Sequence, residues 1–179
     1  MKILTTPDPL LRVKAKPVGQ TTKSLLVKIE EMIALLKSTR DPKGVGLAAT
    51  QVGFNRRVFI LIPKRTPKIF VNPEIVATSD KTLAQEYPDE EDRWLEGCLS
   101  IPRIWGFVDR PYEVKLRYRT LDKNNNLLKP KTETFRGMSA AFVLHELDHL
   151  NGILFTDHIL RQSGQLFREE QGKFHPIKL

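Results

Sequence analysis

Apolar residues recur with the period of a helix in two segments of the chain. Within residues 22–38 they return every three or four positions with charged residues between them, which predicts an amphipathic helix that packs on the core. A second apolar run predicts a mostly buried helix that begins near Ser139, a suitable N-cap, and stops at Asn151-Gly152. The apolar positions of the first helix are Leu25, Leu26, Ile29, Met32, Ile33 and Leu36.

Other segments carry the short apolar or alternating patterns of strands. The predicted strands are residues 57–62, 69–71, 112–118 and a segment around 132–135. We expect an extended arm over residues 1–20, an exposed acidic loop over 78–93 and a C-terminal tail over 160–179, in which any helix would be short. The predicted fold is α+β, a single domain spanning residues 1–179 in which short antiparallel or mixed strands pack around one central helix.

Composition narrows the class of protein. The chain has 179 residues, of which 40% are hydrophobic and 28% charged, and it contains no apolar run that could span a bilayer. The N-terminus has no apolar signal core, so we expect a cytoplasmic protein without a membrane partner. The net charge of +8 is spread over short clusters such as Arg56-Arg57 and Lys64-Arg65. Such charge fits either a solvated surface or attraction to a polyanion such as ribosomal RNA.

The chemistry suggested by the central helix comes from His145-Glu146-Leu147-Asp148-His149. Two histidines four positions apart lie on one face of a helix, so both imidazoles can bind the same metal ion. Glu146 lies beside the first ligand and can handle the proton of a water molecule that the metal activates. The alternative is a helix whose two histidines bind no metal. The apolar surroundings disfavour it, because burying a polar group without a hydrogen-bond partner or ligand destabilises the fold.

A catalytic site of this kind takes a third protein ligand, and the residues alone leave several choices. The candidates are Cys98, His158, Asp148 and an acidic residue between 86 and 96. Cys98 is favoured because a thiolate binds borderline metals strongly and the preceding glycine allows close approach. The third histidine of the metzincin proteases is excluded, because Phe155 occupies that position. Since Cys98 is the single cysteine, no intrachain disulfide can form.

A glycine-rich segment, residues 44–53, superficially matches a dinucleotide-binding fingerprint. That fingerprint needs a strand before it and an acidic residue about 20 positions later. The sequence offers a helix and a polar loop before the segment, and no Asp or Glu between Asp41 and Glu74. We therefore reject nucleotide binding and expect these glycines to let the backbone approach a ligand or another segment closely.

Three motifs in one order resemble the signatures of the peptide deformylases. They are Gly44-Val45-Gly46-Leu47-Ala48-Ala49-Thr50-Gln51, Glu96-Gly97-Cys98-Leu99-Ser100 and His145-Glu146-Leu147-Asp148-His149-Leu150-Asn151-Gly152. The likeness covers roughly residues 3 to 160. It implies a metal-dependent hydrolase that removes the N-formyl group from the formyl-methionine of nascent polypeptides and releases formate. Partners implied are those peptides and a transient association with the ribosome, and we expect a monomer.

The resemblance also assigns roles. Cys98, His145 and His149 would bind one divalent metal, with Fe²⁺ expected and Zn²⁺, Ni²⁺ or Co²⁺ compatible with the ligands. Glu146 would be the general base and acid. The oxyanion hole would be formed by the side-chain amide of Gln51 and the backbone N–H of Leu99.

Substrate binding is implied as well. The main chain of Gly46 and Gly97 would form hydrogen bonds to an extended substrate, which binds as an added strand. Phe142 would line the methionine pocket. Glu96 and Arg110 would form an ion pair that supports the cysteine loop.

Two other functions remain as alternatives. One is a general endopeptidase, which would cut internal bonds without needing a formyl group. The other is a catalytically silent metal-stabilised module that binds RNA or the ribosome, against which the presence of both Glu146 and Gln51 argues. The tail after Arg161 lacks the long basic helix that some deformylases use on the ribosome, and the segment between Asn72-Pro73 and Glu96 is longer and more acidic than in compact members.

Overall fold

The computed structural model describes residues 1–63 and 66–178, so the basic pair Lys64-Arg65 lies outside the described residues. Short 3₁₀ turns occur at Pro9–Arg12, Ala49–Val52 and Glu90–Asp92. The helices are α1 (Lys23–Ser38), α2 (Leu83–Glu86), α3 (Met138–Leu150) and α4 (Phe155–Arg161). The strands are β1 (Gly46–Ala48), β2 (Val58–Leu61), β3 (Lys68–Thr78), β4 (Glu96–Cys98), β5 (Ile101–Gly106), β6 (Glu113–Arg119), β7 (Lys131–Arg136), β8 (Leu166–Glu170) and β9 (Lys173–Pro176).

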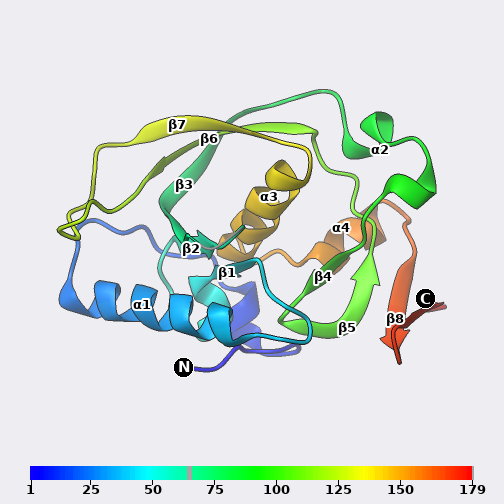
Figure 1. The fold of residues 1–179 in the computed structure, drawn as a ribbon, viewed down its shortest axis with the longest axis horizontal. Coiled ribbons are helices and arrows are strands. Elements are labelled where there is room, and N and C mark those ends of the chain that lie inside the picture. Colours follow the sequence, from blue (N-terminus) through cyan, green and yellow to red (C-terminus); the bar gives the residue numbers. More distant parts are fainter. Residues whose placement is uncertain (64–65, 179) are drawn as a thin grey trace.

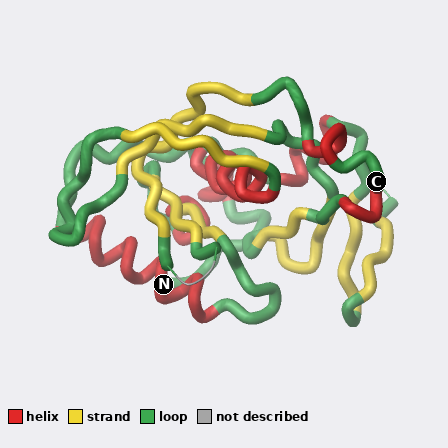
Figure 2. The backbone as a smooth tube through the Cα atoms, turned by 45° about the horizontal axis from the view of Figure 1, so that its top comes forward, coloured by secondary structure: helices red, strands yellow, loops and turns green. Residues whose placement is uncertain are grey.

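Two antiparallel sheets flank the central helix α3. A five-stranded sheet has the order β1-β2-β3-β6-β7 and a four-stranded sheet the order β4-β5-β8-β9. Figure 1 shows α3 in the middle of the molecule with α1 at one side, and Figure 2 shows α3 nearly end-on with strands of both sheets around it. The predicted α+β class with strands around one buried helix is therefore confirmed.

Burial explains why the strand patterns differ. Strand β2 is buried at every position because its two faces are covered by different elements. Phe59 packs in the cluster of α3, whereas Val58 and Ile60 pack in the cluster of α1. Strand β6 has one covered face, so its buried positions alternate with exposed lysine and arginine, as the sequence predicts.

Several boundaries differ from the prediction. Helix α3 begins at Met138 with Gly137 in the N-cap position, so the prediction of Ser139 as the cap was wrong. The backbone of Gly137 has a φ of 55°, which favours glycine, and its N–H donates to the carbonyl of Tyr112. Strand β3 continues beyond Asn72-Pro73, with a shift in its register with β6 at that point. A proline lacks the N–H that regular pairing requires.

The C-terminal segment adds structure that the apolar pattern did not indicate. After α4, strands β8 and β9 form a hairpin that extends the sheet of β4 and β5. Five of its nine strand residues are polar and six are exposed, and Leu166 alone is buried in a core cluster, so the two short strands carry only a weak apolar pattern. In the acidic segment 78–93, helix α2 and a 3₁₀ turn interrupt the predicted loop.

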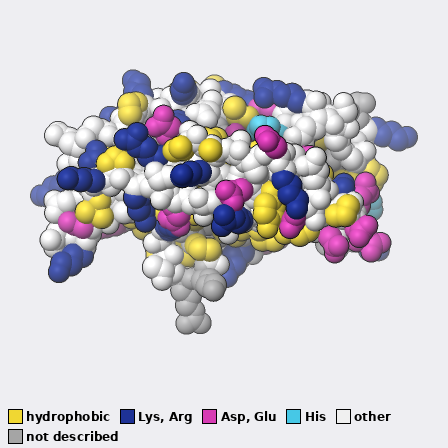
Figure 3. Space-filling model, turned by 90° about the horizontal axis from the view of Figure 1, so that it is seen from above, with side chains coloured by type: hydrophobic (Ala, Val, Ile, Leu, Met, Phe, Trp, Pro, Cys, Tyr) yellow, Lys and Arg dark blue, Asp and Glu magenta, His cyan; other side chains and the backbone are white. Residues whose placement is uncertain are grey.

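Charge is mixed over the surface. Figure 3, seen from above relative to Figure 1, shows Lys and Arg side chains spread over that face with Asp and Glu between them, rather than gathered in one basic patch. Among the described residues, no helix has both the length and the apolar composition needed to cross a bilayer.

Candidate active site

Helix α3 brings both histidines of the motif to one place. His145 and His149 are separated by one helical turn, and their rings lie 4.9 Å apart between centroids. The side chain of His145 is 12% exposed, and His149 and Glu146 are buried. The apolar faces of α3 pack against the five-stranded sheet, which fixes the direction in which these polar side chains point.

Strand β4 supplies the third group. Cys98, His145 and His149 each offer one ligand atom, and these atoms lie within 4.8 Å of one another. The sulfur of Cys98 is 3.2 Å from Nε2 of His149. One thiol and two imidazoles in this spacing fit a divalent transition metal. Burial raises the pKa of the Cys98 thiol, but the two neighbouring histidines outweigh it and hold that pKa well below its usual value, which favours the thiolate.

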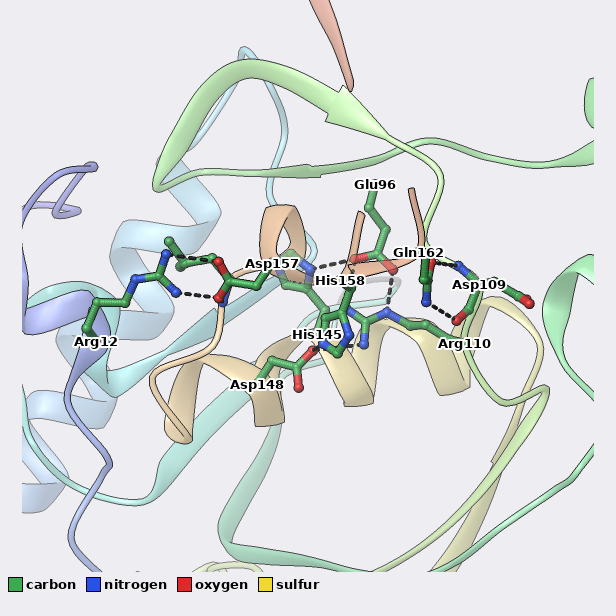
Figure 4. A network of polar contacts seen from close by, with 10 residues as sticks. Arg12, Glu96, Asp109, Arg110, His145, Asp148, Asp157, His158 and Gln162 are labelled. Carbon is green, nitrogen blue, oxygen red and sulfur yellow. Dashed lines mark hydrogen bonds and ion pairs between the residues drawn. The ribbon is translucent and has the colours of Figure 1, made fainter. Parts of the chain in front are cut away.

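The other candidates for the third ligand lie in a separate ion-pair network. Asp148 accepts a bond from Nε2 of His158 at 2.9 Å and one from Arg110 at 2.8 Å. Arg110 also forms two bonds to Glu96, and Glu96 is 2.9 Å from Nδ1 of His145 (Figure 4). Burial opposes the charge of Glu96, yet Arg110 and His145 lower its pKa to about 2. The network therefore reaches from the protein surface to the back of the His145 ring.

Glu146 lies beside the three clustered groups rather than in the ion-pair network. Burial raises the pKa of its carboxyl group to about 7 despite the two nearby histidines. Its Oε2 atom is buried and has no hydrogen-bond partner among the described residues. A Cβ atom built on Gly46 would lie 2.2 Å from Oε1 of Glu146, so a side chain at position 46 would force this carboxylate to move.

A hydrogen bond within its own 3₁₀ turn orients the side chain of Gln51 toward Cys98 and Ser100. Its Oε1 accepts the backbone N–H of Ala48 at 2.8 Å, which leaves the amide Nε2 directed at Ser100 Oγ (3.1 Å) and Cys98 Sγ (3.5 Å). Ser100 is fully buried, and the sequence analysis did not single it out. The sequence offered it only as the last residue of the cysteine motif, a serine between two apolar residues.

A cleft opens over this cluster between the two sheets. Its walls include Gly46, Gln51, Gly97, Leu99, Phe142 and Glu146, together with Trp94 and Trp105, which sequence reasoning missed. Strands β1 and β4 each lie at the edge of their sheet among the described residues, and each contributes a glycine to the cleft. An extended peptide could add to either edge.

The comparison with known families decides the identity of this arrangement. The sequence model of the polypeptide deformylase family matches residues 1–165. The chain belongs to the peptide deformylase family. A peptide deformylase of Cellvibrio japonicus is 37% identical over 179 residues, covering 98% of this chain and 95% of the relative. One from Agrobacterium fabrum is 37% identical over 164 residues, covering 89% and 86%.

Solved structures of deformylases share the fold. A deformylase of Synechococcus elongatus in complex with actinonin is 30% identical, with a TM-score of 0.73, covering 96% of this chain and 80% of that one. The deformylase of Thermotoga maritima is 33% identical, with a TM-score of 0.71, covering 88% and 95%. The deformylase fold, the hydrolase activity and the removal of the N-formyl group from nascent peptides are thus confirmed for this chain. The family is metal-dependent, and the Cys/His cluster is a suitable metal site.

Proposed function

We propose that this deformylase binds its catalytic metal through Cys98, His145 and His149. The observation that carries the proposal is the spacing of one ligand atom from each residue within 4.8 Å, at the floor of the cleft. Nδ1 of His145 is engaged by Glu96, which leaves Nε2 as its ligand atom. When bound, a divalent ion supplies positive charge that acidifies a water molecule and polarises the formyl oxygen. Fe²⁺ is the proposed native ion, and the ligand set also suits Zn²⁺, Ni²⁺ and Co²⁺.

Glu146 is proposed as the general base and acid. Its side chain lines the cleft and its Oε2 atom has no hydrogen-bond partner among the described residues, so this oxygen is free to take a proton from the attacking water. After water adds to the formyl carbon, Glu146 gives that proton to the amine nitrogen as the C–N bond breaks. Formate and a peptide with a free N-terminus are the products.

Gln51 and Leu99 are proposed to stabilise the oxyanion. The Gln51 amide is fixed by its bond from Ala48, so its N–H₂ group needs little reorganisation to donate to a developing negative charge. The backbone N–H of Leu99 follows directly after Cys98 in the same wall of the cleft. Gly46 and Gly97 would bond the substrate backbone, and half-buried Phe142 would line the methionine pocket one turn before His145.

The direct test is formate release from a formyl-Met peptide by protein purified without oxygen, with metal content measured on the same sample. The proposal predicts about one metal per chain and release that stops when a chelator removes it. An unformylated peptide of the same sequence is the control, because a general endopeptidase would cut it internally. Turnover by metal-free protein, or internal cleavage of the control, would contradict the proposal.

We also infer a cytoplasmic monomer that meets its substrates near the ribosome. Nascent chains are the substrate, and a net charge of +8 favours transient contact with a polyanionic particle. Cosedimentation with ribosomes at low salt and release at high salt would be expected. Failure to cosediment at low salt would contradict the association.

A further inference from the structure

A second cavity lies beside the first turn of α1. Its volume is about 410 Å³, and sites for small molecules span about 300–1,000 Å³. Its wall is formed by residues of two segments, 16–25 and 54–56. Among the described residues, this cavity and the cleft share no lining residue. Figure 1 shows the first turn of α1 at the left of the molecule and β4, which borders the cleft, toward the right. The cavity is therefore a separate site.

The charge of this cavity is positive. Lys16 and Arg56 line it, both are exposed, and none of its described lining residues is acidic. No ion pair among the described residues involves either cation. The surrounding stretches of chain, residues 9–29 and 42–73, contain no Asp or Glu. Charge therefore favours an anionic ligand.

The rest of the wall combines apolar and hydrogen-bonding groups. Phe54 is half-buried, and the guanidinium carbon of Arg56 lies 6.0 Å from the centre of its ring. Leu25 of α1 is buried in the wall, and Gln20 and Ser24 add an amide and a hydroxyl. A ligand that fits this wall has a flat apolar part for the Phe54 ring and an anionic part for the cations.

Hydrogen bonds hold the two sides of the cavity together. The backbone N–H of Lys16 donates to Oδ1 of Asn55 at 3.0 Å, and the carbonyl of Lys16 accepts from the N–H of Arg57 at 2.7 Å. The side-chain amide of Asn72 bonds both the N–H and the carbonyl of Val18, at 2.8 and 2.7 Å. These bonds form the wall before any ligand arrives, so binding does not need to order it.

We propose that this cavity binds a nucleotide, with its base stacked on Phe54 and its phosphate beside Lys16 and Arg56. Aromatic stacking and cationic side chains are the contacts by which proteins hold unpaired nucleotides without reading their sequence. A free nucleotide and a nucleotide of an RNA strand present the same base and phosphate. None of the lining residues belongs to the glycine-rich segment 44–53, so the failure of the dinucleotide fingerprint there does not bear on this site.

The first experiment measures binding to the whole protein with two probes. Adenosine monophosphate is titrated by calorimetry and a short fluorescein-labelled oligoadenylate by anisotropy, with inorganic phosphate as the comparison ligand. At least one probe should bind about tenfold or more tightly than inorganic phosphate, because only the probes carry a base. Binding of the monophosphate would identify a free nucleotide as a ligand, whereas binding of the oligomer alone would identify an RNA strand. Failure of both probes, or phosphate binding as tightly as they do, would overturn the inference.

Two kinds of variant separate the two contacts. Phe54→Leu keeps an apolar side chain but removes the stacking surface, so affinity should fall about fivefold or more while its dependence on salt stays unchanged. Lys16→Gln and Arg56→Gln each remove a cation from the phosphate, so affinity should fall and should also decrease less steeply as salt is added. An affinity of Phe54→Leu equal to that of the wild type would reject the stacked base.

Lys37→Gln is the matched control, since it removes the same charge from an exposed position in the last turn of α1. Its affinity for the probe should equal that of the wild type, and equal losses in Lys37→Gln and Arg56→Gln would replace the site by general attraction to positive charge. Formate release should be unchanged in all four variants, because none of the altered residues lines the cleft. Loss of formate release by the wild type would reject the proposed catalysis without affecting the binding result, so the two failures are distinguishable.

Discussion

Oε2 of Glu96 lies 2.9 Å from Nδ1 of His145, so a buried carboxylate from β4 holds the ring of a proposed metal ligand on α3. The other bonds of Glu96 go to Arg110, which is also buried. A partner of this kind fixes the orientation of the imidazole and increases its basicity.

Glu96→Gln should therefore weaken metal binding while leaving the three ligands in place. The neutral amide holds the His145 ring less strongly, and a loss of about 10- to 100-fold in metal affinity is expected. Competition with a chromogenic chelator measures it. Glu133→Gln, at a carboxylate bonded to Tyr118 on the five-stranded sheet, is the control. An affinity equal to the wild type in Glu96→Gln would show that Glu96 does not support the site.

Removal of Arg110 should destabilise the whole fold. Arg110 is 4% exposed and is bonded to both Glu96 and Asp148, so Arg110→Leu leaves the buried Glu96 and the partly buried Asp148 without their shared guanidinium. A loss of about 3–5 kcal/mol in the free energy of unfolding is expected. Arg103→Leu, which removes an ion pair from a side chain 56% exposed, should cost about 1 kcal/mol or less. Urea denaturation compares the two, and similar losses would contradict the buried-network account.

Gly46→Ala should impair turnover more than metal binding. The new Cβ would lie 2.2 Å from Oε1 of Glu146, so the carboxylate must move from its position in the cleft. A shift of this size in a catalytic group is expected to lower kcat by about 100-fold. Gly19→Ala, where no atom lies within 4 Å of the added Cβ, serves as the control. Unchanged kcat in Gly46→Ala would mean that the position of Glu146 is not critical.

The pair of Arg12 and Asp157 predicts how stability depends on pH (Figure 4). Burial raises the pKa of Asp157, but bonds from Arg12 and from the N–H of Leu154 outweigh it and lower that pKa. A carboxyl group whose pKa is lowered by folding stabilises the protein at pH values above its pKa in the unfolded chain, about 3.9. This stabilisation is lost as the pH falls through its lower pKa in the folded protein. Thermal unfolding should thus show Asp157→Asn less stable than wild type at pH 7, with a difference that shrinks as the pH falls from about 4 through the lowered folded pKa. A difference that grows in acid would contradict this sign.

The fold class and the cluster around His145 were predictable because they depend on local patterns. The spacing of apolar residues in α1 predicts a helix with one buried face. The i,i+4 spacing of the histidines in α3 predicts that both rings lie on one side of that helix. The cap of α3 was misplaced because Gly137 takes the role that Ser139 would normally have. The β8–β9 hairpin was not predicted, since its two short strands mix apolar and charged residues without a regular alternation.

Long-range contacts limited the prediction of the site. Asp148 and His158 were candidates for the metal, and only the fold shows that Asp148 bonds both His158 and Arg110. Ser100 holds the Gln51 amide across 49 positions of the chain, a relationship that no local pattern encodes. The place of Trp105 over Gly97 likewise depends on the register of β4 and β5.

The central claim is that Glu146 moves the proton while Cys98, His145 and His149 bind the metal. It is tested most directly by measuring metal content and formate release on one sample of Glu146→Ala. The account predicts about one metal per chain, as in the wild type, with formate release reduced by at least about 100-fold. Retained turnover at full metal content would contradict the role of Glu146, and loss of the metal would show that Glu146 belongs to the ligand set instead.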